Sequence, residues 1–93
     1  MHDIPHARRS YFTTYTGVRL PLKFVNPLEE HEVRNRNTYF CAYYDDADRL
    51  IGCHKLVYGE VELTHRYEYR DDGSLRRAEI TETDDSPREL LFD

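Results

Sequence analysis

Long apolar runs are missing from this chain of 93 residues. No window approaches the roughly 18 consecutive apolar residues that a membrane-spanning helix requires, and the first residues lack the apolar stretch of a secretory signal. We therefore expect no membrane partner and take the cytoplasm as the compartment. Cysteine is also scarce, since Cys41 and Cys53 are the only two. They lie on predicted neighbouring strands, so a disulfide is geometrically conceivable, but a reducing compartment favours two buried free thiols.

Signatures of catalysis are absent as well. There is no glycine-rich phosphate loop and no nucleophile elbow. The acidic residues Glu79, Glu82, Asp84 and Asp85 do not follow the spacing of a calcium-binding loop, and they fit a solvated turn and tail. These absences predict a protein that is not an enzyme and that uses no cofactor.

Basic charge is scarce where binding to nucleic acid would need it. The formal net charge is -5. Residues 37–93 hold seven basic and fourteen acidic side chains, whereas residues 1–36 hold six basic and four acidic ones. An acidic surface repels phosphate backbones and anionic membranes. Unless the short Arg8-Arg9 segment binds alone, we expect no nucleic-acid partner.

Aromatic residues, in contrast, are abundant. Eight Tyr and four Phe accompany 39% hydrophobic and 33% charged residues, which is enough for one modest core in a single domain over residues 1–93. A core of this size contributes only about 3 to 5 kcal/mol of net stability, so burial against another molecule would help. We therefore expect self-association or a protein partner.

The clearest predicted element is a hairpin over residues 61–81. Its first strand alternates apolar or aromatic residues with polar ones over nine positions, the period of a strand with one buried face. The turn at residues 71–74, Asp-Asp-Gly-Ser, contains a glycine that tolerates positive φ. In the returning strand, Leu75 and the pair Ala78 and Ile80 have opposite parity, so a bulge must intervene if all three face one way.

The remaining elements complete a small β domain. Density of strand-forming residues or alternation predicts strands at residues 11–15, 18–25, 38–44 and 50–58. Pro21 cannot donate to a ladder and places its strand at an edge or a bulge, while Asn26, Pro27 and Glu29 form a capping pattern that predicts a short helix over residues 27–33. Residues 1–9 look like a loose N-terminal arm, and residues 82–93 like a polar tail in which 89–92 docks as a last strand. The predicted fold is mainly β: one curled, antiparallel meander sheet of six to seven strands with one short helix near residues 27–33.

Two of the predicted turns share one pattern, a tyrosine strand, an Asp-rich turn and a leucine strand. Residues 42–47 align with residues 68–73, and Leu50 and Leu75 follow after a one-residue offset. The second unit, Tyr67-Glu68-Tyr69-Arg70-Asp71-Asp72-Gly73-Ser74-Leu75, resembles the YD repeat of Rhs-type shells, although Arg70 stands where that repeat has its Asp. The likeness implies shared hairpin physics rather than a shared function. Only about two units exist, which excludes a long solenoid.

Three longer blocks resemble a family of small bacterial proteins of unknown function. They are Tyr11-Phe12-Thr13-Thr14-Tyr15-Thr16-Gly17-Val18-Arg19-Leu20-Pro21-Leu22, Asn35-Arg36-Asn37-Thr38-Tyr39-Phe40 and Val57-Tyr58-Gly59-Glu60-Val61-Glu62-Leu63. The resemblance implies a bacterial origin and transfers no catalytic residue.

Tyrosines carry the main binding hypothesis. Tyr39 and Tyr43 share the parity of one predicted strand, and His65, Tyr67 and Tyr69 share the parity of another, so each set lies on one face. An aromatic face with polar tips is typical of protein interfaces. Packing in the core is the alternative, and it is favoured because the chain has few other large side chains to bury.

A metal site is the weaker hypothesis. Cys41, Cys53 and His54, with His65 as a fourth ligand, have the composition of a Cys2His2 zinc set. However, Cys53 and His54 are consecutive and therefore point to opposite faces of a strand, which favours buried thiols and an imidazole on the sheet surface. The other histidines fit a solvated helix surface or an unstructured arm: His31 beside Glu30 and Glu32, and His2 and His6 near Asp3.

The sequence thus predicts a non-catalytic interaction or accessory protein that uses a tyrosine-bearing sheet face or an exposed strand edge. The alternative is a small-ligand or metal-binding β domain, in which the curled sheet forms a mouth lined by Tyr39, His54, His65 and Tyr67.

Overall fold

The computed structural model describes residues 8–17, 20–83 and 86–92. Its elements are β1 Arg8–Thr16, β2 Lys23–Leu28, α1 Glu30–Val33, β3 Thr38–Tyr44, β4 Leu50–Val57, β5 Glu60–Tyr69, β6 Leu75–Glu82 and β7 Arg88–Leu91. The mainly β prediction is therefore confirmed. In the described part of the chain, no helix is long and apolar enough to cross a membrane.

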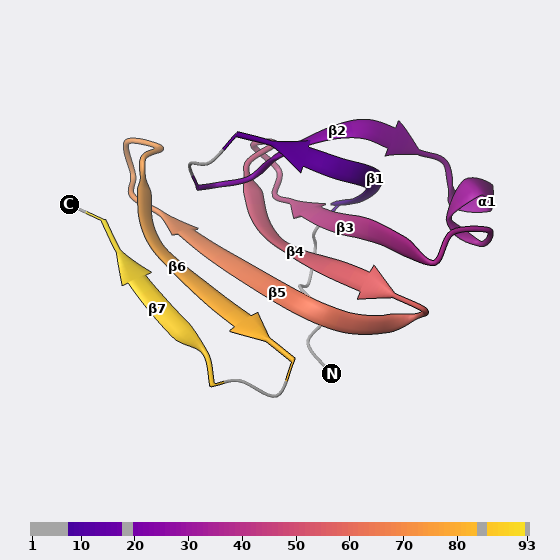
Figure 1. Cartoon of the computed structure of the whole chain (residues 1–93). Helices are drawn as coiled ribbons and strands as arrows, with labels where there is room; N and C mark the ends of the chain where they lie inside the picture. Colours follow the sequence, from indigo (N-terminus) through magenta and orange to yellow (C-terminus); the bar gives the residue numbers. More distant parts are fainter. Residues whose placement is uncertain (1–7, 18–19, 84–85, 93) are drawn as a thin grey trace.

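All seven strands belong to one open antiparallel sheet in the order β2-β1-β3-β4-β5-β6-β7 (Figure 1). From β3 to β7 the strands follow the chain, as a meander does. The first hairpin departs from that order because β1 lies between β2 and β3, so Tyr11 of β1 faces both Leu28 and Cys41. The chain returns from the edge strand β2 to β3 through α1.

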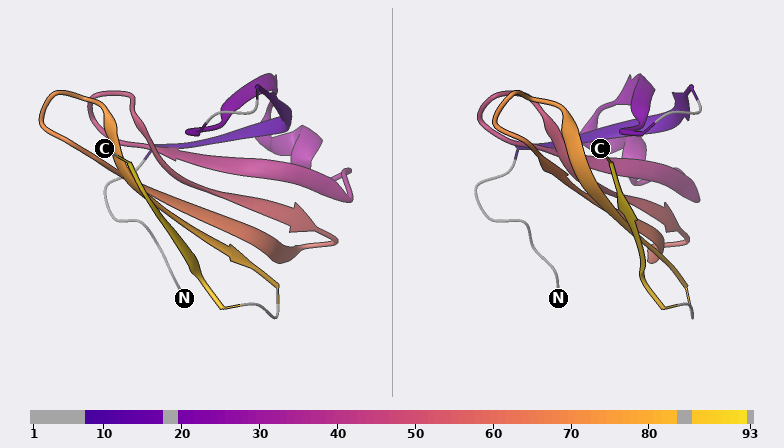
Figure 2. Two further views of the ribbon diagram at one scale, coloured as in Figure 1. Left: turned by 60° about the vertical axis from the view of Figure 1, so that its left-hand side comes forward. Right: turned by 90° about the vertical axis from the view of Figure 1, so that its left-hand side faces the viewer.

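The sheet curls about one of its faces, as Figure 2 shows. Phe12 of β1 and Phe92, which follows β7, pack against the same buried cluster of Ala42, Leu50, Tyr67 and Ala78. Side chains from both ends of the sheet thus converge on one side. We call this side the inner face and the opposite side the outer face.

The prediction of a strand over residues 18–25 is wrong for residues 20–22. Within the described residues, the chain bends at a cis Leu20-Pro21 bond, and β2 begins only at Lys23. Leu20 and Leu22 pack against the inner cluster instead of extending the sheet. Their alternating apolar pattern therefore serves a loop that covers the core; residues 18 and 19 lie outside the described residues.

The predicted helix begins three residues too early. The strand β2 continues through Asn26, which has a φ of 59°, and through Pro27. Proline is tolerated there because β2 is an edge strand. The helix α1 starts at Glu30, and the capping box is formed by Glu29 and Glu32.

Both chain ends are more ordered than expected where the structure describes them. Arg8 and Arg9, predicted to belong to a loose arm, are part of β1 and pair with Tyr44 and Tyr43. Residues 1–7 of that arm lie outside the described residues. The predicted docking of the tail is confirmed, because β7 pairs with β6 from Arg77↔Leu91 to Ile80↔Arg88.

The two similar turns are built in the same way. Tyr44 pairs with Leu50, and Tyr69 with Leu75, each beside a register shift that leaves one extra residue in the second strand. The residue at the same place in each loop has positive φ, 61° for Asp48 and 89° for Gly73. The register that the sequence left open is resolved by a bulge before Ala78, and Tyr44, rather than Tyr43, is the structural equivalent of Tyr69.

Candidate interaction surface

The five predicted binding residues do not form one surface. Tyr39 and Tyr43 project from the outer face of β3, whereas His65, Tyr67 and Tyr69 project from the inner face of β5. Parity within each strand was predicted correctly. The relation between the strands follows from the pairs Cys41↔His54 and Cys53↔His65, which put consecutive residues of β4 on opposite sides.

His65 and Tyr67 form a hydrogen-bonded pair inside the core. They are 6% and 4% exposed, and Nδ1 of His65 lies 2.5 Å from the hydroxyl oxygen of Tyr67. The backbone of Leu22 also hydrogen-bonds that hydroxyl. Burial lowers the pKa of His65, and the positive charge of Arg88 lowers it further. The imidazole is therefore uncharged at neutral pH, and one hydrogen bond joins its Nδ1 to the phenolic hydroxyl.

Tyr69 is also a structural residue. Its ring packs against the inner cluster, and its hydroxyl donates to the carbonyl oxygen of Leu50 at 2.5 Å. Burial raises its pKa to about 12. The guanidinium carbon of Arg49 lies over the ring, 5.4 Å from the ring centroid. His65 and Tyr67 are therefore buried inside the fold and offer no contact surface, whereas Tyr69 is half-buried and packs with one side against the core.

The four residues of the zinc hypothesis are divided in the same way. Cys41 and His54 are paired on the outer face, and Cys53 and His65 on the inner face. Both thiols are free and buried, as predicted. Burial raises the pKa of Cys41 and, to about 12, that of Cys53, so both remain protonated thiols at neutral pH. The arrangement does not converge on a common metal position.

What the outer face does bring together is a patch of rings, which we call the outer aromatic patch: Tyr11, Tyr39, Tyr43 and His54. Tyr11 and Tyr39 make an edge contact with ring centroids 6.0 Å apart. Tyr43 and His54 make another at 5.3 Å, and the Tyr43 hydroxyl lies 3.1 Å from Nδ1 of His54. All four are only half-buried.

Cys41 lies at the centre of this patch. It pairs with Tyr11 on one side and His54 on the other, and it alternates with Tyr39 and Tyr43 along β3. Although it is on the outer face, it is only 4% exposed, because the surrounding rings cover it. Sequence reasoning missed Tyr11 as a member of the patch. Its position in a predicted strand was visible, but its pairing partner was not.

The pKa values of Tyr39, Tyr43 and Cys41 are all raised in the outer aromatic patch. Burial raises the pKa of Tyr39 and of Tyr43, and for Tyr43 the hydrogen bond with Cys41 raises it further. Arg9, at the rim, opposes the shift at Tyr43 and at Cys41. These three groups therefore stay uncharged, and the patch presents aromatic carbon with hydroxyl tips.

The other half of the outer face is charged. Arg77 binds the carboxylates of Glu68 at 2.6 Å, Glu79 at 3.2 Å and Glu89. Arg76 adds a second contact to Glu68 at 3.3 Å. This network spans β5, β6 and β7 and is typical of a solvated sheet surface. The outer face thus changes from aromatic to charged between β4 and β5.

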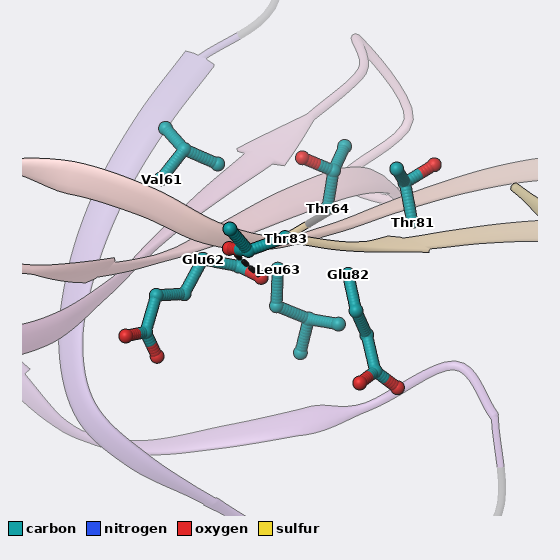
Figure 3. Close-up of a pocket in the computed structure, with 7 residues that line it drawn as sticks. All are labelled: Val61, Glu62, Leu63, Thr64, Thr81, Glu82 and Thr83. Carbon is teal, nitrogen blue, oxygen red and sulfur yellow. Dashed lines mark hydrogen bonds between the residues drawn. The ribbon is translucent and has the colours of Figure 1, made fainter. Parts of the chain in front are cut away.

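A cavity of about 270 Å³ lies at the ends of β5 and β6 (Figure 3). In the figure, Val61, Thr64 and Thr81 project to one side of the sheet, and Leu63 and Glu82 to the other. The remaining lining residues are Glu62 and Thr83, whose hydroxyl donates to the Glu62 carbonyl oxygen. None of the predicted mouth residues lines this cavity, and it lacks a convergent set of polar groups.

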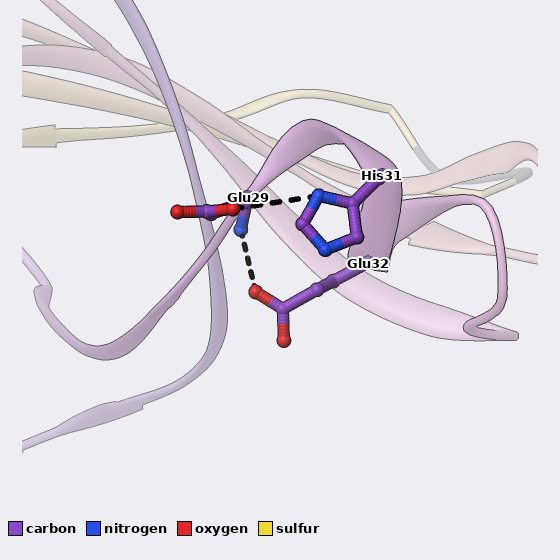
Figure 4. Close-up of side chains that lie close together, drawn as sticks. All are labelled: Glu29, His31 and Glu32. Atoms are coloured by element: carbon purple, nitrogen blue, oxygen red, sulfur yellow. Dashed lines mark hydrogen bonds and ion pairs between the residues drawn. The ribbon is translucent and has the colours of Figure 1, made fainter.

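Glu29, His31 and Glu32 bring ligand atoms within 4.8 Å of one another on α1 (Figure 4). All three are exposed, and both carboxylates already cap the helix. His31 Nδ1 lies 3.4 Å from Glu29. The cluster is explained by helix capping, in line with the predicted solvated helix surface.

Comparison with known proteins assigns the chain to a family but does not assign it an activity. The chain belongs to a family of unknown function (DUF6156), whose sequence model matches residues 4–93. No curated protein and no solved structure matches it. The predicted membership of an uncharacterised family is confirmed, while the likeness to the YD repeat stays a prediction.

Proposed function

We propose that this member of the family is a non-catalytic interaction protein that binds another protein through the outer aromatic patch. The observation that supports the proposal is the exposure of four half-buried rings on β1, β3 and β4. In residues 8–17, 20–83 and 86–92, no second sheet and no helix packs over them. A cytoplasmic accessory protein is the role that such a surface fits.

The chemistry of the patch favours a protein partner. Tyrosine supplies a large contact area with little loss of side-chain entropy, together with a hydroxyl that can hydrogen-bond at the rim. Because Tyr39, Tyr43 and Cys41 carry no charge in this environment, covering them does not require desolvation of an ion. The charged network of Arg77 on the neighbouring half would remain in water and limit the contact to the aromatic half.

The structure gives less support to the alternative of a ligand mouth. Its four predicted lining residues are divided between the faces, with Tyr39 and His54 outside and His65 and Tyr67 buried inside. A single cavity cannot be lined by both pairs without opening the sheet. Binding on the outer face needs no rearrangement of the core.

Affinity capture with matched variants tests the proposal. The variant Tyr11→Arg with Tyr39→Arg places two charges in the patch, and the control Val61→Arg with Thr81→Arg places two on the outer face of β5 and β6, at positions that do not pair with a patch residue. Tagged wild-type protein and both variants are used as baits in lysate of the cells that encode the protein. Proteins that are captured are quantified by mass spectrometry, and circular dichroism verifies that both variants are folded.

The expected result is a specific partner that the wild type and the control retain and that the patch variant loses by on the order of tenfold or more, since a buried unpaired charge costs several kcal/mol. A partner retained equally by all three proteins contradicts the proposal. The same conclusion follows if the control loses the partner as strongly as the patch variant does.

A further inference from the structure

The two edges of the sheet differ in their capacity to accept another strand. At the β2 edge, Asn26 has positive φ and Pro27 has no N–H, which interrupts a ladder. At the β7 edge the strand is regular, and it carries two exposed apolar side chains, Leu90 at 38% and Leu91 at 70%. Among the described residues, the sheet ends at β7.

The hydrogen bonding of β7 determines which backbone groups face away from the sheet. The N–H of Phe92 donates to the carbonyl oxygen of Arg76 at 3.0 Å. Because bonding alternates along an antiparallel strand, Leu90 and Arg88 also direct their N–H and C=O groups toward β6. Glu89 and Leu91 direct theirs toward the open edge.

We propose that the β7 edge pairs with β7 of a second copy of this chain, antiparallel and centred on Leu90. In this register Glu89 of each copy lies opposite Leu91 of the other. Both pairs are of the hydrogen-bonded kind, so all outward backbone groups of the two residues are satisfied. The two Leu90 side chains meet on the symmetry axis, and the seven-stranded sheets become one continuous sheet.

Charge and hydrogen bonding select this register over its neighbours. Centring on Glu89 would place the two Glu89 side chains directly opposite each other, which is destabilising in a sheet. Centring on Leu91 leaves one hydrogen-bonded pair within the described part of β7. In the Leu90-centred register, Glu89 keeps its ion pair with Arg77 while its methylenes lie beside Leu91 of the other copy.

The size of the core gives a reason for such an assembly. Eight apolar side chains are buried in the described part of the chain, and small domains commonly gain stability by association. The surface is separate from the outer aromatic patch, because β7 and β3 lie at positions seven and three of the sheet order. The dimer can therefore exist whether or not the patch binds a partner.

Cysteine cross-linking tests the register. Directly opposite residues of the non-hydrogen-bonded kind have Cα atoms about 4.5 Å apart, within the disulfide range of about 4.4 to 6.8 Å. Leu90→Cys should therefore yield a covalent dimer on mild oxidation, and Glu89→Cys should not. The native thiols do not compete, since Cys41 and Cys53 are only 4% and 2% exposed. Equal cross-linking of both variants, or of neither, overturns the proposal.

Light scattering over a concentration series tests the assembly itself. The mass of the wild type should rise from 11.2 kDa toward twice that value. Leu91→Glu should weaken the dimer by on the order of tenfold, because it places a carboxylate directly opposite Glu89 of the other copy in each of the two pairs. The control Tyr58→Glu removes a side chain that is 76% exposed at a distant turn and should leave the dimer unchanged. A constant 11.2 kDa, or equal weakening by both variants, refutes pairing of two copies at β7.

Discussion

Removing one oxygen atom, by Tyr67→Phe, should destabilise the protein far more than its size implies. Tyr67 is 4% exposed, and its hydroxyl has two partners in the core. It shares a hydrogen bond of 2.5 Å with Nδ1 of His65 and accepts another from the backbone of Leu22. Phenylalanine fills the same space but leaves both partners unpaired, so the expected cost comes from hydrogen bonding and not from a cavity.

The magnitude follows from the number of orphaned groups. Each buried polar group left without a partner costs about 1 to 3 kcal/mol. His65 is buried, whereas Leu22 is only half-buried and can recover part of its loss from water. We therefore expect Tyr67→Phe to lower the free energy of unfolding by about 2 to 3 kcal/mol. For a domain of this size, that is a fall in Tm of about 10 to 20 °C.

Urea unfolding followed by far-ultraviolet circular dichroism measures this effect. Tyr58→Phe is the control, because Tyr58 is 76% exposed and the change should be close to neutral. A double-mutant cycle with His65→Leu isolates the pair: Tyr67→Phe should cost at least about 1 kcal/mol less once His65 is gone. A loss within about 0.5 kcal/mol of wild type, or no coupling in the cycle, would refute the reasoning.

Three further predictions use the same unfolding assay. Tyr69→Phe, which removes a single hydrogen bond to a carbonyl oxygen, should cost about 1 kcal/mol. A cost equal to that of Tyr67→Phe would contradict the reasoning that the cost follows the number of partners left without a hydrogen bond. The lowered pKa of His65 means that the unfolded state binds a proton first, so stability should fall as the pH drops below about 6.5, by up to about 1.4 kcal/mol per pH unit. His65→Gln should flatten that slope, whereas His31→Gln, at an exposed position, should preserve it. Gly73→Ala should cost about 1 kcal/mol through its φ of 89° alone, since nothing lies within 4 Å of the added methyl group. Asp48→Gly, at the equivalent site, should be close to neutral, because relief of the positive φ offsets the loss of an exposed ion pair with Arg8.

Strands with strong local signals were predicted well. Residues 38–44 coincide with β3, because seven consecutive residues favour a strand and an Asp-rich turn ends them. The bulge in the β5–β6 hairpin was also predictable, since Leu75 could not otherwise join Ala78 on the inner face. In both cases the information is local: a run of residues and the turn that follows it.

The N-terminal region was predicted less well because two local patterns were equally valid. Asn26 and Glu29 have the spacing of a capping box, and so do Glu29 and Glu32. Only the second pair caps the helix, since pairing with β1 keeps Asn26 and Pro27 in a strand. The choice depends on a neighbour that is adjacent in space, and alternation in the sequence carries no information about it.

The candidate site was mispredicted for a related reason. Parity assigns residues to a face within one strand, but the phase between strands depends on every turn and bulge that separates them. From Tyr43 to His65 the chain passes through two turns and a register shift in each of two ladders. Tyrosines that look equivalent in the sequence therefore face the outside on β3 and the core on β5.

The repeated hairpin explains how a chain with so few apolar residues completes its core. Without the extra residue after each turn, Leu50 and Leu75 would have the parity of the outer face. The register shifts return them to the inner face, opposite Tyr44 and Tyr69. Each tyrosine is then covered by an arginine, Arg8 over Tyr44 at 4.8 Å and Arg49 over Tyr69 at 5.4 Å. Two bulges thus add two leucine–tyrosine pairs to a core that alternation alone would leave open at this end, and they leave Tyr39 and Tyr43 free to form the outer aromatic patch.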